Sequence, residues 1–255
     1  MHRHLLGLGA LALLLAWGVA PVGAEIPSSI QPATLVAQES QEKKEEKAET
    51  EVSKFRHLEP FDAAQAPALT EVQRVRFQTS AGDLELEIYP QAAPNAAQRF
   101  IELVKAGFYD QTPIFRVVSV PHPFVAQFGI NWRPGMVEWK NKMFQDDPSL
   151  FHLTEGTLAF AKAGPNTNST QVFINYGDND FLRGQNFSTF GIVTKGLDIA
   201  RNFKSVGSAD MGLDQGRLWS NGEAYLNSLP LNQQPTMIIK AELIEDEEPP
   251  KEEKK

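Results

Sequence analysis

The residues that could do chemistry stand in PIFRVVSVPHPFVAQFG, residues 113–129. This stretch holds two apolar pieces of strand length, Ile114–Val118 and Phe124–Phe128, with Arg116 in the first and Gln127 in the second. A charge inside an apolar run is costly unless it is paired or used. Taken alone, Arg116 is more often a paired structural arginine and Gln127 a buried, hydrogen-bonded amide. The surrounding sequence must therefore show whether Arg116 and Gln127 have a structural or a chemical role.

The composition excludes several other kinds of chemistry. The 255 residues contain no cysteine, which removes thiol catalysis, disulfides and cysteine zinc sites. None of the five histidines has a metal-ligand spacing such as HxxxH or HExxH. The net charge of −8 argues against a nucleic-acid partner. The sequence shows no requirement for a cofactor.

The elements that must position Arg116 and Gln127 begin near residue 71. Apolar side chains alternate with arginines before residues 80–83 and with glutamates after them, which predicts a hairpin whose arginines and glutamates pair across one face. A helix over 95–106 follows, with Asn95 as its cap and Gly107 at its end, and a second helix is predicted over 196–204. Residues 207–232 form a long polar excursion that could contain a helix around 222–229.

Six further apolar runs have the length of strands. They are Ile114–Val118, Phe124–Phe128, Thr157–Ala161, Gln171–Ile174, Thr189–Val193 and Met237–Leu243. With the hairpin they make roughly eight mostly consecutive strands, a pattern that predicts a mainly β fold. We expect a closed antiparallel barrel capped by two helices, with a sandwich as the alternative.

The most distinctive stretch, residues 156–193, contains AGPNTN, then Gln171 and Val-Phe-Ile. This order closely resembles the central signature of the cyclophilins, the barrel-fold peptidyl-prolyl cis/trans isomerases. Phe115–Val118 resembles their arginine strand, and Phe124–Gly129 resembles their Phe-x-x-Gln-Gly-Gly strand with a phenylalanine in place of the first glycine. The resemblance covers nearly all of 72–244 and implies a closed eight-stranded cyclophilin-like barrel with isomerase activity.

The resemblance implies that Arg116 contacts the substrate proline. Rotation about an Xaa-Pro bond breaks amide conjugation, so the prolyl nitrogen becomes a better hydrogen-bond acceptor only in the twisted state. An arginine placed there binds the transition state more tightly than either ground state. Gln127 and Phe124 complete the catalytic set that the family implies.

The remaining groove residues follow from the resemblance one by one. Phe124, Phe173 and Leu182 correspond to the apolar residues around the proline ring, Val125 to a common methionine and Phe181 to a common tryptophan. Ala161 and Lys162 correspond to the segment that pairs with the peptide backbone, and Gln171 to a polar groove residue. The family's groove histidine has no clear counterpart, and the resemblance leaves its place to Asn186 or Phe187. The segment 119–123 is longer than in the family, and it could alter the groove rim or displace Phe124.

Both ends of the chain differ from this central part. Residues 1–24 have a short basic start, an apolar run and a Val-Gly-Ala ending, which predicts a cleaved signal peptide. Residues 25–70 are predicted to be a charged, disordered linker, 71–244 the isomerase domain, and 245–255 a disordered tail. The mature protein is then exported and keeps no stable membrane anchor. We expect a periplasmic location, with the thylakoid lumen and the extracellular space as alternatives.

Two classes of function stay open at this point. The first is an isomerase that acts on proline-containing segments of exported proteins during folding, as a monomer. The alternative is a proline-peptide binding module of low activity, or a scaffold in an envelope or membrane-associated assembly.

Overall fold

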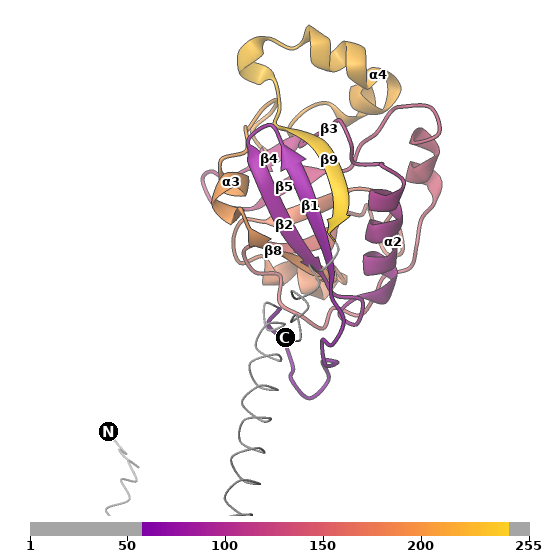
Figure 1. Cartoon of the computed structure of the whole chain (residues 1–255). Helices are drawn as coiled ribbons and strands as arrows, with labels where there is room; N and C mark the ends of the chain where they lie inside the picture. The colour runs from indigo at the N-terminus through magenta and orange to yellow at the C-terminus, as the bar shows by residue number, and fades with distance from the viewer. Residues whose placement is uncertain (1–57, 245–255) are drawn as a thin grey trace, which may run out of the picture. The chain divides into compact units, whose positions relative to one another are not determined.

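The computed structural model describes residues 58–244, which form one strongly curled antiparallel sheet with helices at its margins (Figure 1). The predicted signal peptide, most of the predicted linker and the predicted C-terminal tail lie outside the described residues. The strands are β1 (Gln73–Thr79), β2 (Gly82–Ile88), β3 (Thr112–Pro113), β4 (Arg116–Val118), β5 (Val125–Phe128), β6 (Thr157–Phe160), β7 (Val172–Asn175), β8 (Gly191–Lys195) and β9 (Met237–Ile244). The α-helices are α2 (Pro94–Lys105), α3 (Leu197–Arg201) and α4 (Gln215–Ser228), and the 3-10 helices are η1 (Val137–Asn141), η2 (Asp180–Gln185) and η3 (Leu231–Gln233).

The sheet corrects the predicted number of strands and the predicted closure. Nine strands hydrogen-bond in the order β3-β9-β1-β2-β8-β6-β7-β5-β4, so β3 and β4 stand at the two ends of the described sheet. The prediction of eight strands had one strand over Ile114–Val118 and none at Thr112–Pro113, which is β3 in the structure. In the structure the segment 112–118 changes partner midway, because the Ile114 amide donates to the Thr236 carbonyl and the Phe115 amide to the Gln127 carbonyl. The architecture is a mainly β half-barrel.

The predicted hairpin is confirmed as β1 and β2. The strands pair in an antiparallel register that places Arg74 opposite Glu87, and Arg74 Nε lies 3.2 Å from Glu87 Oε1. Val75 and Phe77 alternate with the arginines and are fully buried. The period of two therefore predicted the buried apolar face correctly, whereas Glu87 on the polar face is also buried, paired with Arg74.

The core fills the concave side of the sheet beneath α2. Its rings meet at centroid distances of 5.0–6.1 Å, with edge-on or tilted geometries that suit aromatic pairs, and they are Phe77, Phe100, Tyr109, Phe128, Phe144, Phe160 and Phe190. Phe128, which stands where the resemblance leads one to expect a glycine, is fully buried in this cluster. The substitution thus adds a ring to the core.

The helices lie where they were predicted, but their caps and lengths differ from the prediction. Asn95 does not cap α2, because the Asp147 carboxylate accepts hydrogen bonds from the amides of Asn95 and Ala96 at 3.2 and 2.9 Å. The helix predicted over 196–204 spans only Leu197–Arg201. The helix predicted near 222–229 is the second half of α4, which starts at Gln215 and is kinked at Asn221. Figure 1 shows α4 across the end of the sheet beyond β3 and β9.

Residues 58–70, which the sequence places in the linker, are packed on the domain. Leu58 is buried with Tyr89 and Phe151, and the Phe61 amide donates to the Leu150 carbonyl at 3.0 Å. The Arg183 guanidinium also stacks on the Phe61 ring. This part of the predicted linker therefore belongs to the folded unit. The other predicted boundaries stay predictions. Between residues 58 and 244, no helix is both long and apolar enough to cross a bilayer.

Candidate functional site

A groove of about 510 Å³ opens on the sheet where β4, β5 and β7 run side by side. It is lined by Arg116, Phe124, Val125, Gln127, Ala161, Lys162, Ala163, Thr167, Ser169, Gln171, Phe173, Leu182, Phe187, Met211 and Gln215. The groove thus gathers residues from strands, loops and the start of α4. A cation stands on one side of it and an apolar wall on another.

Arg116 is placed by the register of β4 against β5, in which it stands directly opposite Gln127. Its Nη1 donates to Gln127 Oε1 at 3.0 Å, and its Nε donates to the main-chain carbonyl of Asp210 at 2.6 Å. Gln127 is almost fully buried and donates in turn to Gln171 Oε1 at 2.8 Å. Gln171 donates to Gln215 Oε1 at 3.2 Å. A row of amides therefore orients the guanidinium.

The guanidinium keeps a donor for a ligand. Among residues 58–244, Nη2 of Arg116 has no hydrogen-bond partner, and Arg116 forms no ion pair. Partial burial lowers the pKa of Arg116, and the Asp210 carboxylate opposes that effect. Because an arginine loses its proton only above about pH 12, the group stays charged at any ordinary pH.

Phe124 forms the floor of the groove beside this cation. Its amide donates to the Val118 carbonyl at 2.9 Å, which closes the β4–β5 hairpin around the 119–123 loop. Its carbonyl accepts from the Tyr176 amide and from Asn179 Nδ2, both at 2.8 Å. The Arg116 guanidinium lies over the Phe124 ring, 5.5 Å from its centroid. The longer 119–123 loop therefore does not displace Phe124 from the groove.

The apolar wall comes from β5, β7 and η2. Val125, Phe173 and Leu182 are buried together, with Phe124, Ala161 and Phe187 packed around them. Phe187 lies 5.9 Å from Phe173 between ring centroids. The wall is therefore built of apolar side chains and offers a bound group no polar side chain.

The helix η2, which carries Leu182, is tied down at its first residue. Asp180 Oδ1 accepts from the Leu153 amide at 3.3 Å and from Arg183 Nε at 2.9 Å, and its Oδ2 lies 3.1 Å from His152 Nδ1. Burial raises the pKa of Asp180, but the hydrogen bonds from Arg183, Leu153 and His152 outweigh it and the net pKa is lowered.

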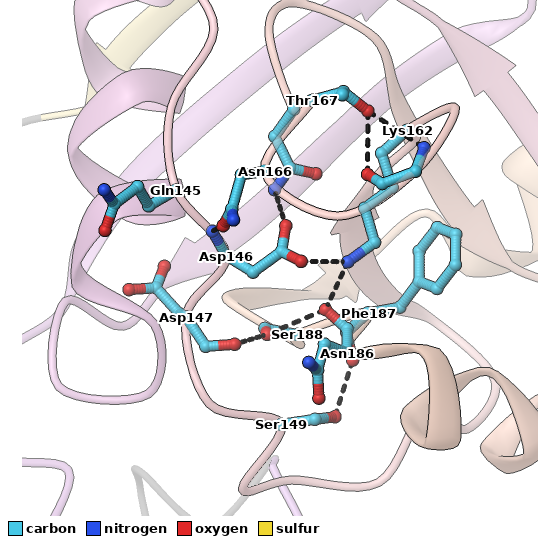
Figure 2. Close-up of polar contacts among 12 residues, drawn as sticks. Gln145, Asp146, Asp147, Ser149, Lys162, Asn166, Thr167, Asn186, Phe187 and Ser188 are labelled. Atoms are coloured by element: carbon cyan, nitrogen blue, oxygen red, sulfur yellow. Dashed lines mark hydrogen bonds and ion pairs between the residues drawn. The ribbon is translucent and has the colours of Figure 1, made fainter.

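The side chain of Lys162 ends in a polar cluster that it forms with Asp146 and Asn186 (Figure 2). Its Nζ lies 2.6 Å from Asp146 Oδ2 and donates to the Asn186 carbonyl at 2.9 Å. The side chains of Lys162 and Asp146 are 3% and 9% exposed, so this ion pair is buried. It joins three loops, and one of them carries the Phe187 ring of the groove wall.

The structure brings ten of the twelve predicted site residues to the groove lining. Phe181 is outside the lining and 64% exposed, although its ring stacks on Phe124 at 6.3 Å. Asn186 is also outside it, and Phe187 occupies the wall instead. The sequence reading missed five lining residues, Ala163, Thr167, Ser169, Met211 and Gln215. Ala163 and Thr167 belong to the AGPNTN signature itself and Ser169 follows it directly, so the signature could have indicated all three.

Within the described residues, no three histidine, cysteine, aspartate or glutamate side chains come close enough to hold an ion. The groove itself offers Arg116, the glutamine amides and the apolar wall.

The fold is a curled antiparallel half-barrel whose groove holds an arginine, a glutamine and an apolar wall. The family model for cyclophilin type peptidyl-prolyl cis-trans isomerase/CLD matches residues 74–217. The chain therefore belongs to the cyclophilin family, and it is a peptidyl-prolyl cis-trans isomerase by family.

Individual relatives agree with this assignment. Peptidyl-prolyl cis-trans isomerase cypE of Dictyostelium discoideum is 34% identical over 139 residues, which are 52% of this chain and 86% of that protein. Peptidyl-prolyl cis-trans isomerase B of Escherichia coli is 30% identical over 151 residues, 55% of this chain and 90% of that protein. A cyclophilin crystal structure from Cryptosporidium parvum shares the fold with a TM-score of 0.51 at 21% identity, over 69% of this chain and 100% of that one.

Proposed function

We propose that the groove at Arg116 binds Xaa-Pro segments and accelerates their rotation. The observation that carries this proposal is how the Arg116 guanidinium is held and which of its donors stays available. It is oriented by Gln127 and by the Asp210 carbonyl, it keeps Nη2 for a ligand, and it stands beside an apolar wall. A second crystal structure of the Cryptosporidium parvum protein, with a TM-score of 0.50, was obtained in the presence of the dipeptide Ala-Pro, which supports a proline-containing ligand for a groove of this fold.

The chemistry follows from where the polar and apolar groups stand. The barrier to peptide rotation is about 18–20 kcal/mol because the C–N bond has partial double-bond character. Val125, Phe173 and Leu182 hold the proline ring without competing hydrogen bonds. The Arg116 guanidinium then donates to the prolyl nitrogen, whose lone pair is free only in the twisted state. Because the amide row holds the donor beforehand, little reorganisation is needed during rotation.

The backbone of the substrate meets the main chain of Ala161 and Lys162. Nζ of Lys162 is bonded to Asp146 and to the Asn186 carbonyl, so this side chain does not compete with a peptide for the groove. Gln127 and Gln171 orient the arginine and face the peptide. Phe181 stands at the outer rim, where it shields the Phe124 ring.

The decisive experiment compares the full chain with its Arg116→Ala variant. Cis-to-trans exchange in an Ala-Pro-Phe peptide is followed by NMR, and the loss of a preorganised charged donor should slow it by about 10²–10³-fold. Arg133→Ala is the matched control, because Arg133 also donates to main-chain carbonyls, at 2.9 Å, but lies outside the groove lining. Exchange at the uncatalysed rate in the wild-type chain would instead favour the binding-module alternative.

The clients that we propose are exported proteins in the course of folding. Uncatalysed Xaa-Pro isomerisation takes tens to hundreds of seconds, which is slow enough to limit folding. The support is the signal-like sequence of residues 1–24, together with a chain that uses no cysteine. We propose a bacterial, periplasmic monomer, in which residues 207–232 are a C-terminal insertion. Cell fractionation with N-terminal sequencing tests this, and a mature protein starting at Glu25 is expected. Retention of Met1 would refute export by cleavage.

A further inference from the structure

The loop Gly207–Leu213 is pressed against the strand that carries the groove arginine. Ser208 and Gly212 exchange two main-chain hydrogen bonds of 2.9 Å, which closes the loop on itself. The Leu213 amide donates to the Phe115 carbonyl at 2.8 Å. The Asp210 carbonyl accepts from Arg116 Nε at 2.6 Å. The loop therefore contacts both the main chain and the side chain of the arginine strand.

The geometry of this contact leaves the loop little freedom. Gly212 has a φ of +69°, and a Cβ at that position would lie 2.2 Å from the Phe115 carbonyl oxygen. Only glycine can adopt this backbone at this distance. The next residue, Leu213, is buried with Phe115 and Leu218. The loop is thus anchored at its base, and its tip has a fixed place beside Arg116.

Met211 is the apolar side chain at this tip. It is 57% exposed and lines the groove together with Arg116 and Phe124. Single exposed apolar residues are common on protein surfaces. This one differs because the loop that carries it is held in place and because its side chain lines the same groove as Arg116 and the apolar wall. A methionine is flexible and polarisable, so it can pack against apolar side chains of different shapes.

We propose that Met211 is a specificity-determining residue, which forms an apolar subsite for a large apolar side chain flanking the substrate proline. The proposal rests on the function proposed for the groove. With the proline ring against Phe173, the peptide passes Arg116 and places a neighbouring residue at the tip of the loop. A leucine or phenylalanine there covers the methionine, whereas an alanine does not reach it.

The test measures selectivity in the full chain. Two peptide series vary the residue before and the residue after the proline among Ala, Leu, Phe and Glu, and kcat/KM and Kd are measured for each. In one of the two series, Met211→Ala is expected to lower kcat/KM about five- to tenfold for the Leu and Phe peptides and to raise their Kd by the same factor. The change for Ala peptides should stay below about twofold. Met143→Ala is the matched control, since Met143 is 59% exposed but does not line the groove.

The outcomes separate this inference from the proposed function. An equal loss for all peptides, or unchanged selectivity, would overturn the role of Met211. If the wild-type chain catalyses no exchange, the proposed function fails, yet the Kd series still decides whether Met211 selects apolar neighbours. A second variant, Met211→Glu, should weaken Leu and Phe peptides further and Glu peptides most, because it places a carboxylate at the same tip.

Discussion

The buried ion pair between Lys162 and Asp146 offers the sharpest test of how the groove wall is held. The two side chains are 3% and 9% exposed, and Nζ also donates to the Asn186 carbonyl at 2.9 Å. Lys162→Met removes the charge and keeps most of the aliphatic volume. The variant leaves the Asp146 carboxylate buried without its cation, and leaves the Asn186 carbonyl with only the long 3.5 Å hydrogen bond from Ser188 Oγ (Figure 2).

The expected loss of stability can be worked out from these contacts. Removing one partner of a buried ion pair costs about 3–5 kcal/mol, because a charge stays buried without compensation. Asp146 keeps a hydrogen bond of 2.7 Å from Asn168 Nδ2, so we expect the lower end, about 3 kcal/mol. A domain of this size loses about 2–4 °C in Tm per kcal/mol, which gives a drop of about 6–12 °C.

The effect on the groove should be separable from the effect on stability. The Asn186 carbonyl belongs to the residue before Phe187, so the segment that carries the ring loses one of its hydrogen bonds and keeps the one from Ser149 Oγ to the Phe187 carbonyl. The hydrogen bonds of Arg116 do not involve Lys162. We therefore expect KM for an Ala-Pro-Phe peptide to rise severalfold while kcat changes less than twofold.

The assay combines urea unfolding with peptide exchange kinetics on the full chain. Lys195→Met is the matched control, because Lys195 lies 2.7 Å from Glu85 in an ion pair whose lysine is 72% exposed. Such a surface pair contributes about 0–1 kcal/mol. Replacing both buried partners, with Lys162→Met and Asp146→Leu together, should cost less than the sum of the single changes. A Lys162→Met variant as stable as Lys195→Met would refute the reasoning.

Three further perturbations test other contacts of the site. Asn179→Ala removes a buried donor to the Phe124 carbonyl and should cost about 1–3 kcal/mol in urea unfolding and raise KM, and an unchanged KM would show that Phe124 is held without it. Gly129→Ala should cost about 3 kcal/mol or more, because φ is +103° and a Cβ would lie 2.3 Å from a carbonyl oxygen. Gly135→Ala, at φ +83° with open space around it, is its control, and an equal loss in both would contradict the steric argument. The lowered pKa of Asp180 adds stability that is present above the ordinary pKa of about 3.9 and is lost as pH falls through the lower folded value. Asp180→Asn should therefore flatten the acid side of a ΔG-against-pH profile measured from pH 6 to 2, and an unaltered profile would argue against this linkage.

The parts of the fold that sequence could predict are those with a local period or a continuous motif. Alternation over Gln73–Ile88 predicted the hairpin and its buried face. The arginine and glutamine motifs predicted two strands, and the register brings Arg116 opposite Gln127. Such patterns work because the side chains of a strand alternate between two faces regardless of what packs on them.

The contacts that sequence could not predict join segments far apart in the chain. Asp147 supplies the cap of α2 from 51 residues away, so the local candidate Asn95 was the wrong choice. Lys162 finds Asp146 and Asn186 only because three loops converge. The Asp210 carbonyl reaches Arg116 across 94 residues. A main-chain acceptor carries no residue identity, and no motif could have marked it.

The two acceptors that orient Arg116, on Gln127 and Asp210, also explain why its charge can serve a substrate. Both groups that orient Arg116 are neutral, a carboxamide oxygen and a main-chain carbonyl. A carboxylate would hold the guanidinium as firmly. It would also neutralise part of the positive charge with which the guanidinium binds the lone pair of the twisted prolyl nitrogen. Across residues 58–244, Arg116 forms no ion pair, and the Asp210 carboxylate acts on it only at longer range, where it raises the pKa of Arg116 against the effect of burial. Holding the donor with neutral groups fixes its direction and leaves its charge available, which is what selective binding of a transition state requires.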